Sequence, residues 1–553
     1  MKKIIIAFIL SPLFIACNGD GQNTNGKSND SSDGEKGELD KKMTKRDYSI
    51  TPAVAYNNIF FDSAAMEKFF IEEKASDVII RRMRSFYNSR NYQYAWFTPT
   101  GLTEQARGFW NLHNYQTTYS KDTSLKDKAL QAKMDDYAEQ DEFTVAPSNK
   151  GILQTELKMT QHFIMYSLNS IEDGFIKRKE MERFIPRFKV DPVYLGDSLV
   201  NKKHKDGKYY GDVNKRYKGL QDAMAKYLDI QKAGGWPVVD ASVRKVKAGS
   251  SSPAIVSLKR RLHMSGDMPA NDTSAVFNDT LKNAIMSFQS SFGYTADGSL
   301  SELQVKDMNV PVTTRIEQIL VNMGRMQWLV NDPSGRFLLV NIPEFILHAT
   351  EDGKKVFDMN VVVGKEGHNT VTFTGMMNQV VFAPYWNVPV SIVKKELMPK
   401  IASNPGYLES QNMEINGDEG GVPSIRQKPG PGNSLGKVKF LFPNSYNIYF
   451  HDTPAKSLFS KDKRAYSHGC IRLSDPEKMA NYVLQNNDSW TPEKISEAMN
   501  AGEEKFVKIS KPIPVLITYY TAWVDESGKL HFADDIYDHD KAIGAKMFIN
   551  SSL

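Results

Sequence analysis

The chain has 553 residues, of which 41% are hydrophobic and 11% aromatic, enough for two to four domains with packed cores. Its 70 basic residues nearly balance its 65 acidic ones, and a formal net charge of only +5 argues against a nucleic-acid partner. No long apolar run follows the N-terminus, so the sequence predicts no transmembrane helix.

The N-terminal residues have the pattern of an export signal. Lys2 and Lys3 are basic, residues 4–10 are apolar, and the small residue Ala16 stands directly before Cys17. This pattern predicts a lipoprotein signal peptide over residues 1–16 and lipidation of Cys17, with an ordinary signal peptide and an incidental cysteine as the alternative. Residues 17–45 are polar and predict a flexible tether. We therefore expect a cell-envelope protein that lies in the periplasm and is anchored by its lipid to the outer membrane.

Residues 46–240 show charged, amphipathic helical patterns and no catalytic motif. Aromatic residues such as Trp96, Phe97 and Trp110 are more often core residues than parts of a binding platform. We interpret the region as a helical scaffold domain.

A second helical unit is predicted over residues 245–310, followed by a linker helix over 311–336. Two apolar stripes at spacings of three and four define its core. Their members are Ile255, Leu258 and Leu262 in the first stripe, and Leu281, Ala284, Ile285, Phe288 and Phe292 in the second. Periodicity alone indicates only a bundle of about three helices. The stretch from Leu281 to Gly298, with Ser287-Phe288-Gln289 and Asp297-Gly298, resembles the small peptidoglycan-binding domain.

From Phe337 the pattern changes to short β-branched and aromatic runs separated by turn residues, including Phe337–Val340, Val361–Val363 and Val380–Phe382. We expect a mostly β domain over residues 337–513 and a C-terminal segment over 514–553. Residues 394–436 interrupt the strand pattern and are long for a connection, which is typical of a lid or binding loop. The predicted fold class is therefore α+β and multidomain.

Cys470 is the candidate nucleophile, because it lies in Ser467-His468-Gly469-Cys470-Ile471-Arg472 and a thiolate needs a nearby base. His451, which follows a predicted strand over 447–450, is one candidate base, and His468 in the turn is another. Gly469 allows close backbone approach, so successive amides could form an oxyanion hole. Arg472 places a positive charge nearby. The plainer alternative is a buried structural cysteine.

His451 followed by the 467–472 motif resembles the signature of L,D-transpeptidases with the YkuD-type catalytic domain. Further segments resemble the large multidomain members of that family, in patches from Ser76 to Asp540. They are Tyr385-Trp386-Asn387-Val388-Pro389, Asn404-Pro405-Gly406-Tyr407-Leu408, Pro429-Gly430-Pro431-Gly432-Asn433-Ser434-Leu435-Gly436, His451-Asp452-Thr453-Pro454 and Thr518-Tyr519-Tyr520-Thr521-Ala522-Trp523-Val524.

The resemblance implies that Cys470 is the nucleophile, that His451 is its general base and acid, and that backbone near Asp452 orients the imidazole. It implies an oxyanion hole made by the amides of His468, Gly469 and Cys470. It places Arg472, Trp386, Tyr385 and Asn387 near the substrate peptide, and makes residues 394–436 a capping insert. Two positions depart from the family pattern: Thr370-Val371 stands where many relatives have Thr-Pro, and His468 stands where close large relatives often have Ser.

We therefore expect a peptidoglycan L,D-transpeptidase. Its partners would be a donor tetrapeptide stem and an acceptor amine on a neighbouring stem, joined in a 3→3 cross-link through a thioester. No metal or other cofactor is expected, because acyl transfer through a thioester needs none. A wall cysteine peptidase and an enzyme that attaches proteins to the wall share the same catalytic residues and stay open, as does a non-catalytic peptidoglycan-binding scaffold.

Overall fold

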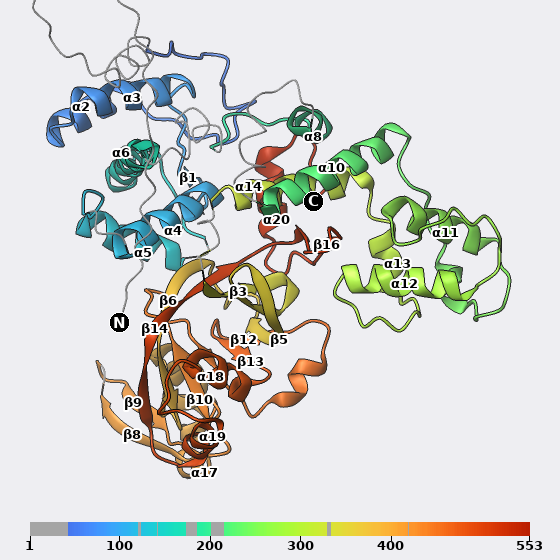
Figure 1. Cartoon of the computed structure of the whole chain (residues 1–553). Coiled ribbons are helices and arrows are strands. Elements are labelled where there is room, and N and C mark those ends of the chain that lie inside the picture. Colours follow the sequence, from blue (N-terminus) through green and yellow to red (C-terminus); the bar gives the residue numbers. More distant parts are fainter. Residues whose placement is uncertain are drawn as a thin grey trace, which may run out of the picture.

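The computed structural model describes residues 43–119, 123–140, 142–172, 185–200, 215–328, 333, 335–418 and 420–553. The predicted signal peptide and Cys17 lie outside the described residues. Figure 1 shows a helical region above a β-rich domain, with a small helical bundle projecting to one side. This arrangement confirms the predicted α+β multidomain class. Within the described ranges, no helix has both the length and the hydropathy needed to cross a membrane.

The N-terminal helical body surrounds an aromatic core. Its elements are α2 (Ser63–Glu72), α3 (Asp77–Asn88), β1 (Phe97–Thr98), β2 (Gly101–Leu102), α4 (Glu104–Tyr119), α5 (Lys128–Glu139) and α6 (Lys150–Glu172). The ring of Trp96 lies 5.4 Å from those of Phe109 and Phe163, centroid to centroid. Trp96, Phe97 and Trp110 are fully buried, as predicted for core residues.

The remaining scaffold helices, α8 (Pro192–Val200) and α10 (Lys215–Lys232), pack in a different core. There they meet the linker helix α14 (Val312–Met326) and the C-terminal elements. These elements are β15 (Ala522–Val524), β16 (Leu530–Phe532) and α20 (His539–Met547). The region predicted as one scaffold therefore contributes to two cores, and the C-terminal segment completes the second.

The small bundle contains α11 (Ala254–Ser265), α12 (Asp279–Ser291) and α13 (Glu302–Met308). The predicted apolar stripes form its core, with Leu258, Leu262 and Phe288 fully buried. Phe292 at the end of α12 lies 5.5 Å from Phe532 of β16, centroid to centroid, so the bundle contacts the second core.

The β-rich domain is built on a nine-stranded sheet in the order β12-β5-β13-β11-β10-β6-β14-β3-β4. An additional β4–β5 pairing closes the sheet on itself, which leaves β12 attached outside the ring. The strands are β3 (Arg336–Asn341), β4 (Ile346–Glu351), β5 (Lys354–Gly364), β6 (Phe373–Phe382), β10 (Val438–Leu441), β11 (Phe450–His451), β12 (Ala465–Ser467), β13 (Ile471–Leu473) and β14 (Lys505–Thr518).

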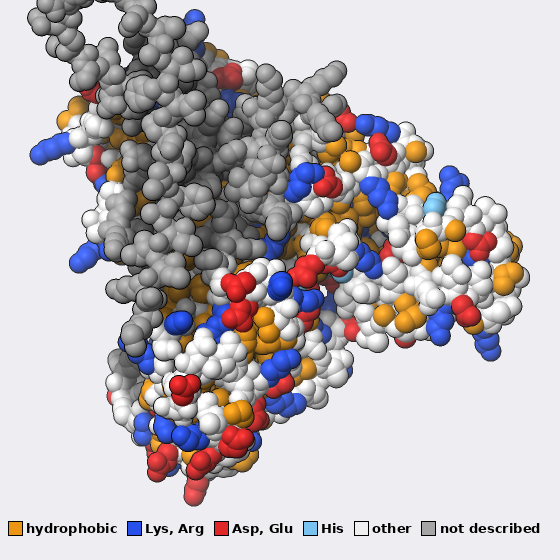
Figure 2. Space-filling model, in the orientation of Figure 1, with side chains coloured by type: hydrophobic (Ala, Val, Ile, Leu, Met, Phe, Trp, Pro, Cys, Tyr) orange, Lys and Arg blue, Asp and Glu red, His pale blue; other side chains and the backbone are white. Residues whose placement is uncertain are grey.

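The interior of this closed sheet is the largest apolar core of the chain's described part, and α18 (Pro476–Leu484) and α19 (Pro492–Asn500) pack against it. Strand β14 pairs with both β6 and β3 and continues to Thr518, beyond the boundary expected at residue 513. The β-rich domain and the C-terminal segment are thus joined by one continuous strand. On the face in Figure 2, basic and acidic side chains are interspersed over this domain, which agrees with the balanced composition.

The capping insert has its own small sheet and core. Its strands are β7 (Trp386–Asn387), β8 (Met413–Asp418) and β9 (Pro423–Gln427), in the order β7-β9-β8. Its helices are α15 (Val390–Ile392), η3 (Val393–Leu397), α16 (Met398–Ser403) and α17 (Tyr407–Ser410). Val388, Val393, Leu397 and Ile425 are buried together between them. Because β7 belongs to this sheet, the insert begins at Trp386, earlier than the predicted residue 394.

Candidate active site

Two adjacent parallel strands position the candidate nucleophile and the candidate base. Strand β11 pairs with β13, with Phe450 opposite Ile471 and His451 opposite Arg472. Phe450 and Ile471 are fully buried in the core. Because side chains alternate across a strand, His451, Arg472 and the preceding Cys470 lie on the other face. The expected strand over 447–450 is therefore corrected to Phe450–His451: His451 lies within the strand, where pairing restrains its backbone.

Cys470 is a free thiol next to a tyrosine hydroxyl. Its Sγ lies 3.6 Å from the carbonyl oxygen of Asn447, and the hydroxyl of Tyr449 hydrogen-bonds the sulfur. Burial raises the pKa of the Cys470 thiol, against the opposing effects of Tyr449 and the Arg472 guanidinium. The sequence analysis missed Tyr449, although its position two residues before His451 in an extended segment places both side chains on one face.

His451 is fully buried and held in a single tautomer. Its Nδ1 donates to the backbone oxygen of Asp452 at 2.5 Å, and a carbonyl can only accept, so the proton is on Nδ1. Burial lowers the pKa of His451 to about 3, with a further contribution from the Arg472 charge. The imidazole is therefore neutral at pH 7, with Nε2 able to accept a proton.

The backbone that orients His451 is itself restrained through the Asp452 carboxylate. Its Oδ2 accepts from Lys437 N at 2.9 Å, and its Oδ1 accepts from Thr453 N at 2.7 Å and Lys456 Nζ at 2.6 Å. Gly436 has φ +62°, and a Cβ there would overlap the Asp452 carboxyl group. The last glycine of the 429–436 segment thus makes room for Asp452, the residue that orients the His451 ring.

The turn before the nucleophile is closed by Ser467. Its Oγ donates to the Cys470 carbonyl at 2.5 Å and accepts from the Gly469 amide at 3.1 Å. Gly469 has φ +108°, a conformation that favours glycine. Because its N–H is already bonded within the turn, the expectation that three amides share the oxyanion hole is corrected for Gly469. The role of Ser467 was not predicted, although it lies in the motif.

His468 faces the capping insert. Its Nε2 lies 3.0 Å from Glu396 Oε1 in η3, and its ring lies 4.8 Å from that of His368, centroid to centroid. His468 is therefore a contact between the nucleophile turn and the insert, which separates its role from that of His451.

Of the predicted substrate-binding residues, Arg472 lies opposite His451 in the paired strands, and the Tyr385 carbonyl accepts from Nζ of Lys439, which pairs with His451 on its other side. Trp386 and Asn387 pair with Gln427 and Arg426 in the insert sheet. The Tyr385 ring lies 4.3 Å from the Arg426 guanidinium, and its amide donates to Glu504 at 3.0 Å. These three residues therefore lie at the base of the insert.

Chemically, the site is a neutral thiol beside a neutral, oriented imidazole. Such a pair can attack an acyl carbonyl if the imidazole removes the thiol proton during the attack. The same imidazole can return that proton to a leaving amine.

Comparisons with known proteins agree with this chemistry. Residues 335–503 match the family described as the L,D-transpeptidase catalytic domain, and residues 81–224 match a family described as the scaffold domain. A Haemophilus influenzae protein named "Putative L,D-transpeptidase" is 29% identical over 243 residues, which cover 41% of this chain and 49% of that protein. The chain thus spans about half the length of the curated relative it matches.

Solved structures with similarity include an L,D-transpeptidase from Stackebrandtia nassauensis, at 14% identity and a TM-score of 0.22, covering 51% of this chain and 96% of that one. Another is an L,D-transpeptidase from Mycobacterium smegmatis, at 14% identity and a TM-score of 0.19, covering 34% of this chain and 59% of that one. The family likeness rests on the sequence matches, in which residues 335–503 match the L,D-transpeptidase catalytic domain.

Proposed function

We propose that the chain is a peptidoglycan L,D-transpeptidase that forms 3→3 cross-links by cysteine acyl transfer. The observation that carries the proposal is the pairing of β11 and β13, which places the free thiol and the oriented imidazole of His451 on one face of the matched domain.

In the proposed reaction, His451 Nε2 takes the Cys470 proton as Sγ attacks the carbonyl at the L-centre of the diaminoacyl residue in a donor tetrapeptide. The tetrahedral intermediate expels D-Ala, whose amine takes the proton from His451, and a thioester remains. A side-chain amine of a neighbouring stem then attacks the thioester and loses a proton to His451. The Cys470 sulfur leaves as thiol, and a new amide joins the two stems.

The position of the capping insert supports the proposal that the acyl group is transferred to an amine and not to water. Glu396 of the insert bonds His468 of the nucleophile turn, so the insert contacts the site directly. A cover over the thioester would exclude water and leave the acceptor amine as the principal nucleophile.

The test is mass spectrometry of muropeptides after the purified protein has acted on tetrapeptide-rich sacculi. We expect 3→3 dimers with loss of one D-Ala per cross-link, and none with Cys470→Ala. Tripeptides without dimers would instead identify a peptidase. Release of D-Ala together with a wall-bound protein lysine would identify a protein-attachment enzyme, and unchanged sacculi would favour a non-catalytic scaffold.

We also propose lipid attachment at Cys17 and action in the cell envelope, on the pattern of residues 1–17. Metabolic labelling with an alkyne fatty acid should label the wild-type chain and leave Cys17→Ser unlabelled. Equal labelling of both would contradict the proposal.

A further inference from the structure

The peptide group between Gly469 and Cys470 is held from the side opposite the nucleophile. Thr370 Oγ1 donates to the Gly469 carbonyl at 2.7 Å. In a trans peptide the C=O and N–H point in opposite directions, so anchoring the oxygen directs the Cys470 N–H away from Thr370. Gly469 adopts φ +108° and has no side chain to restrict the backbone around it. The orientation of the peptide group that follows it therefore depends on such an anchor.

The hydroxyl of Thr370 is itself restrained by two hydrogen bonds, one that it accepts and one that it donates. Thr370 is fully buried, and its Oγ1 accepts from the Gly364 amide at 2.9 Å while donating to Gly469. Gly364 ends β5, and a Cβ there would overlap the His368 carbonyl. The hydroxyl therefore bridges the end of a core strand and the nucleophile turn.

A residue of the C-terminal segment completes this bridge. The Tyr537 hydroxyl donates to the Gly364 carbonyl at 2.6 Å and accepts from the Thr370 amide at 3.2 Å. The Tyr537 amide in turn donates to the Tyr519 hydroxyl at 2.9 Å, which donates to Asp535 Oδ1 at 2.7 Å. Tyr537 is buried, and its ring stacks on that of Tyr519.

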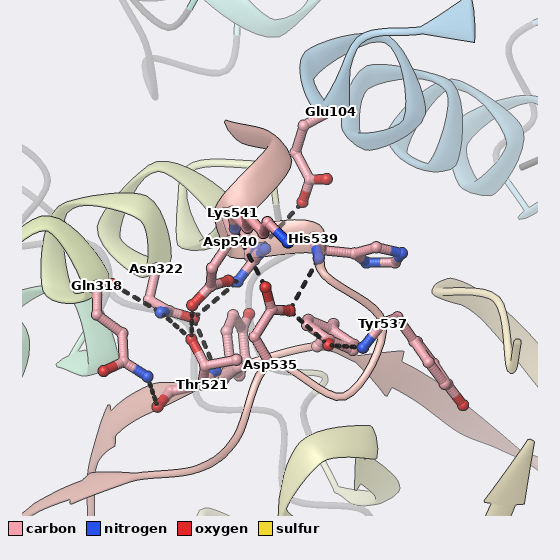
Figure 3. A network of polar contacts seen from close by, with 12 residues as sticks. Glu104, Gln318, Asn322, Thr521, Asp535, Tyr537, His539, Asp540 and Lys541 are labelled. Atoms are coloured by element: carbon pink, nitrogen blue, oxygen red, sulfur yellow. Dashed lines mark hydrogen bonds and ion pairs between the residues drawn. The ribbon is translucent and has the colours of Figure 1, made fainter. Parts of the chain in front are cut away.

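The same contacts continue into the scaffold, as Figure 3 shows. Arg325 of α14 lies over the Tyr519 ring at 5.1 Å from its centroid. Its Nη1 donates to Asp540 at 2.5 Å and its Nε donates to Glu104 of α4 at 3.0 Å. Buried contacts thus connect the scaffold, the linker helix and the C-terminal segment to Thr370.

We propose that Thr370 and Tyr537 are positioning residues that direct the Cys470 N–H toward the oxyanion of the acylation step. The inference rests on the proposed function, since it assumes that Cys470 is acylated. It gives the C-terminal segment a task in catalysis: Tyr537 holds the loop that holds the nucleophile turn.

The test compares two reactions of Cys470 in the full chain. Acylation by a carbapenem develops negative charge on a carbonyl oxygen, whereas alkylation by iodoacetamide displaces iodide and develops none. Thr370→Val keeps the side-chain shape and removes the hydroxyl. We expect it to slow carbapenem acylation by about 10- to 100-fold, near or below the effect of losing one oxyanion donor. The iodoacetamide rate should stay within about twofold.

Thr370→Ser should restore acylation, and Tyr537→Phe should reproduce part of the loss. The matched control is Thr518→Val, because Thr518 Oγ1 also donates to a buried backbone carbonyl, that of Val340, at 3.1 Å. It should change neither rate. Equal slowing of both reactions in Thr370→Val and Tyr537→Phe, or of neither, would overturn the inference. A wild-type protein that reacts with iodoacetamide and not with carbapenem would overturn the proposed function itself.

Discussion

Replacing His451 by Ala should change both the rate of Cys470 acylation and its dependence on pH. Burial raises the thiol pKa above its ordinary value of 9.0, so the resting thiol is protonated at pH 7. Without the base, attack requires prior ionisation, and at most about one thiol in 100 is ionised two pH units below its pKa. Loss of His451 should therefore slow acylation at pH 7 by at least about 100-fold, within the range typical of general bases.

The pH profile provides a second and more specific signature. Because burial and Arg472 lower the His451 pKa to about 3, the wild-type base stays neutral, and its acylation rate should stay level from about pH 8 down to about pH 5. The variant rate should instead rise about tenfold per pH unit up to at least pH 9, because it follows the ionised thiol fraction.

The assay is the time course of the carbapenem mass shift on the intact protein from pH 5 to pH 10. His468→Ala is the control, since its ring faces Glu396. It should lose far less activity and keep the level profile. Equal losses in both variants, with neither recovering at high pH, would show that the two histidines act together and would refute the division of roles.

Three further changes have defined outcomes. Cys470→Ala should abolish cross-linking, with a loss of up to about 10⁶-fold, and should also abolish the carbapenem mass shift. Its thermal unfolding midpoint should stay near that of the wild type. A mass shift that persists in this variant would show that the carbapenem labels another residue. Gly436→Ala should slow acylation and lower the unfolding free energy by about 1–3 kcal/mol, because φ +62° and overlap with Asp452 both oppose a side chain; a wild-type denaturant midpoint would contradict this. Burial opposes the charge of His348, but its hydrogen bonds to Asp358 and Glu344 outweigh burial and raise the pKa of His348 to about 9. The charged imidazole therefore stabilises the fold, and His348→Gln should remove that stabilisation. The loss of unfolding free energy should be complete below pH 6.5 and should disappear as the pH rises through 9. A difference in unfolding free energy between the wild type and His348→Gln that grows with pH would contradict this prediction.

Local patterns were sufficient to predict a candidate nucleophile and the helical bundle. A cysteine between glycine and a strand, beside a histidine motif, predicts a nucleophile by residue type and short spacing. The stripe through Leu281 and Phe288 predicts a buried helix face because helical periodicity depends only on neighbours along the chain. The same signal could not show which partner covers a face, so residues 46–240 were interpreted as one body although α8 and α10 pack against α14 and the C-terminal segment.

The chemical state of the site was decided by tertiary structure. His451 and His468 are the same residue type and lie in neighbouring motifs, so the sequence does not separate their contacts. In the folded chain, His451 bonds the backbone oxygen of Asp452, whereas His468 contacts Glu396 of the insert. Tyr537 lies far along the chain from Gly469, yet it holds the nucleophile turn through Thr370. Its partners are backbone groups, which every residue carries, so no sequence pattern marks them. Only the closed sheet and the C-terminal segment that packs beside it bring these groups within hydrogen-bonding distance.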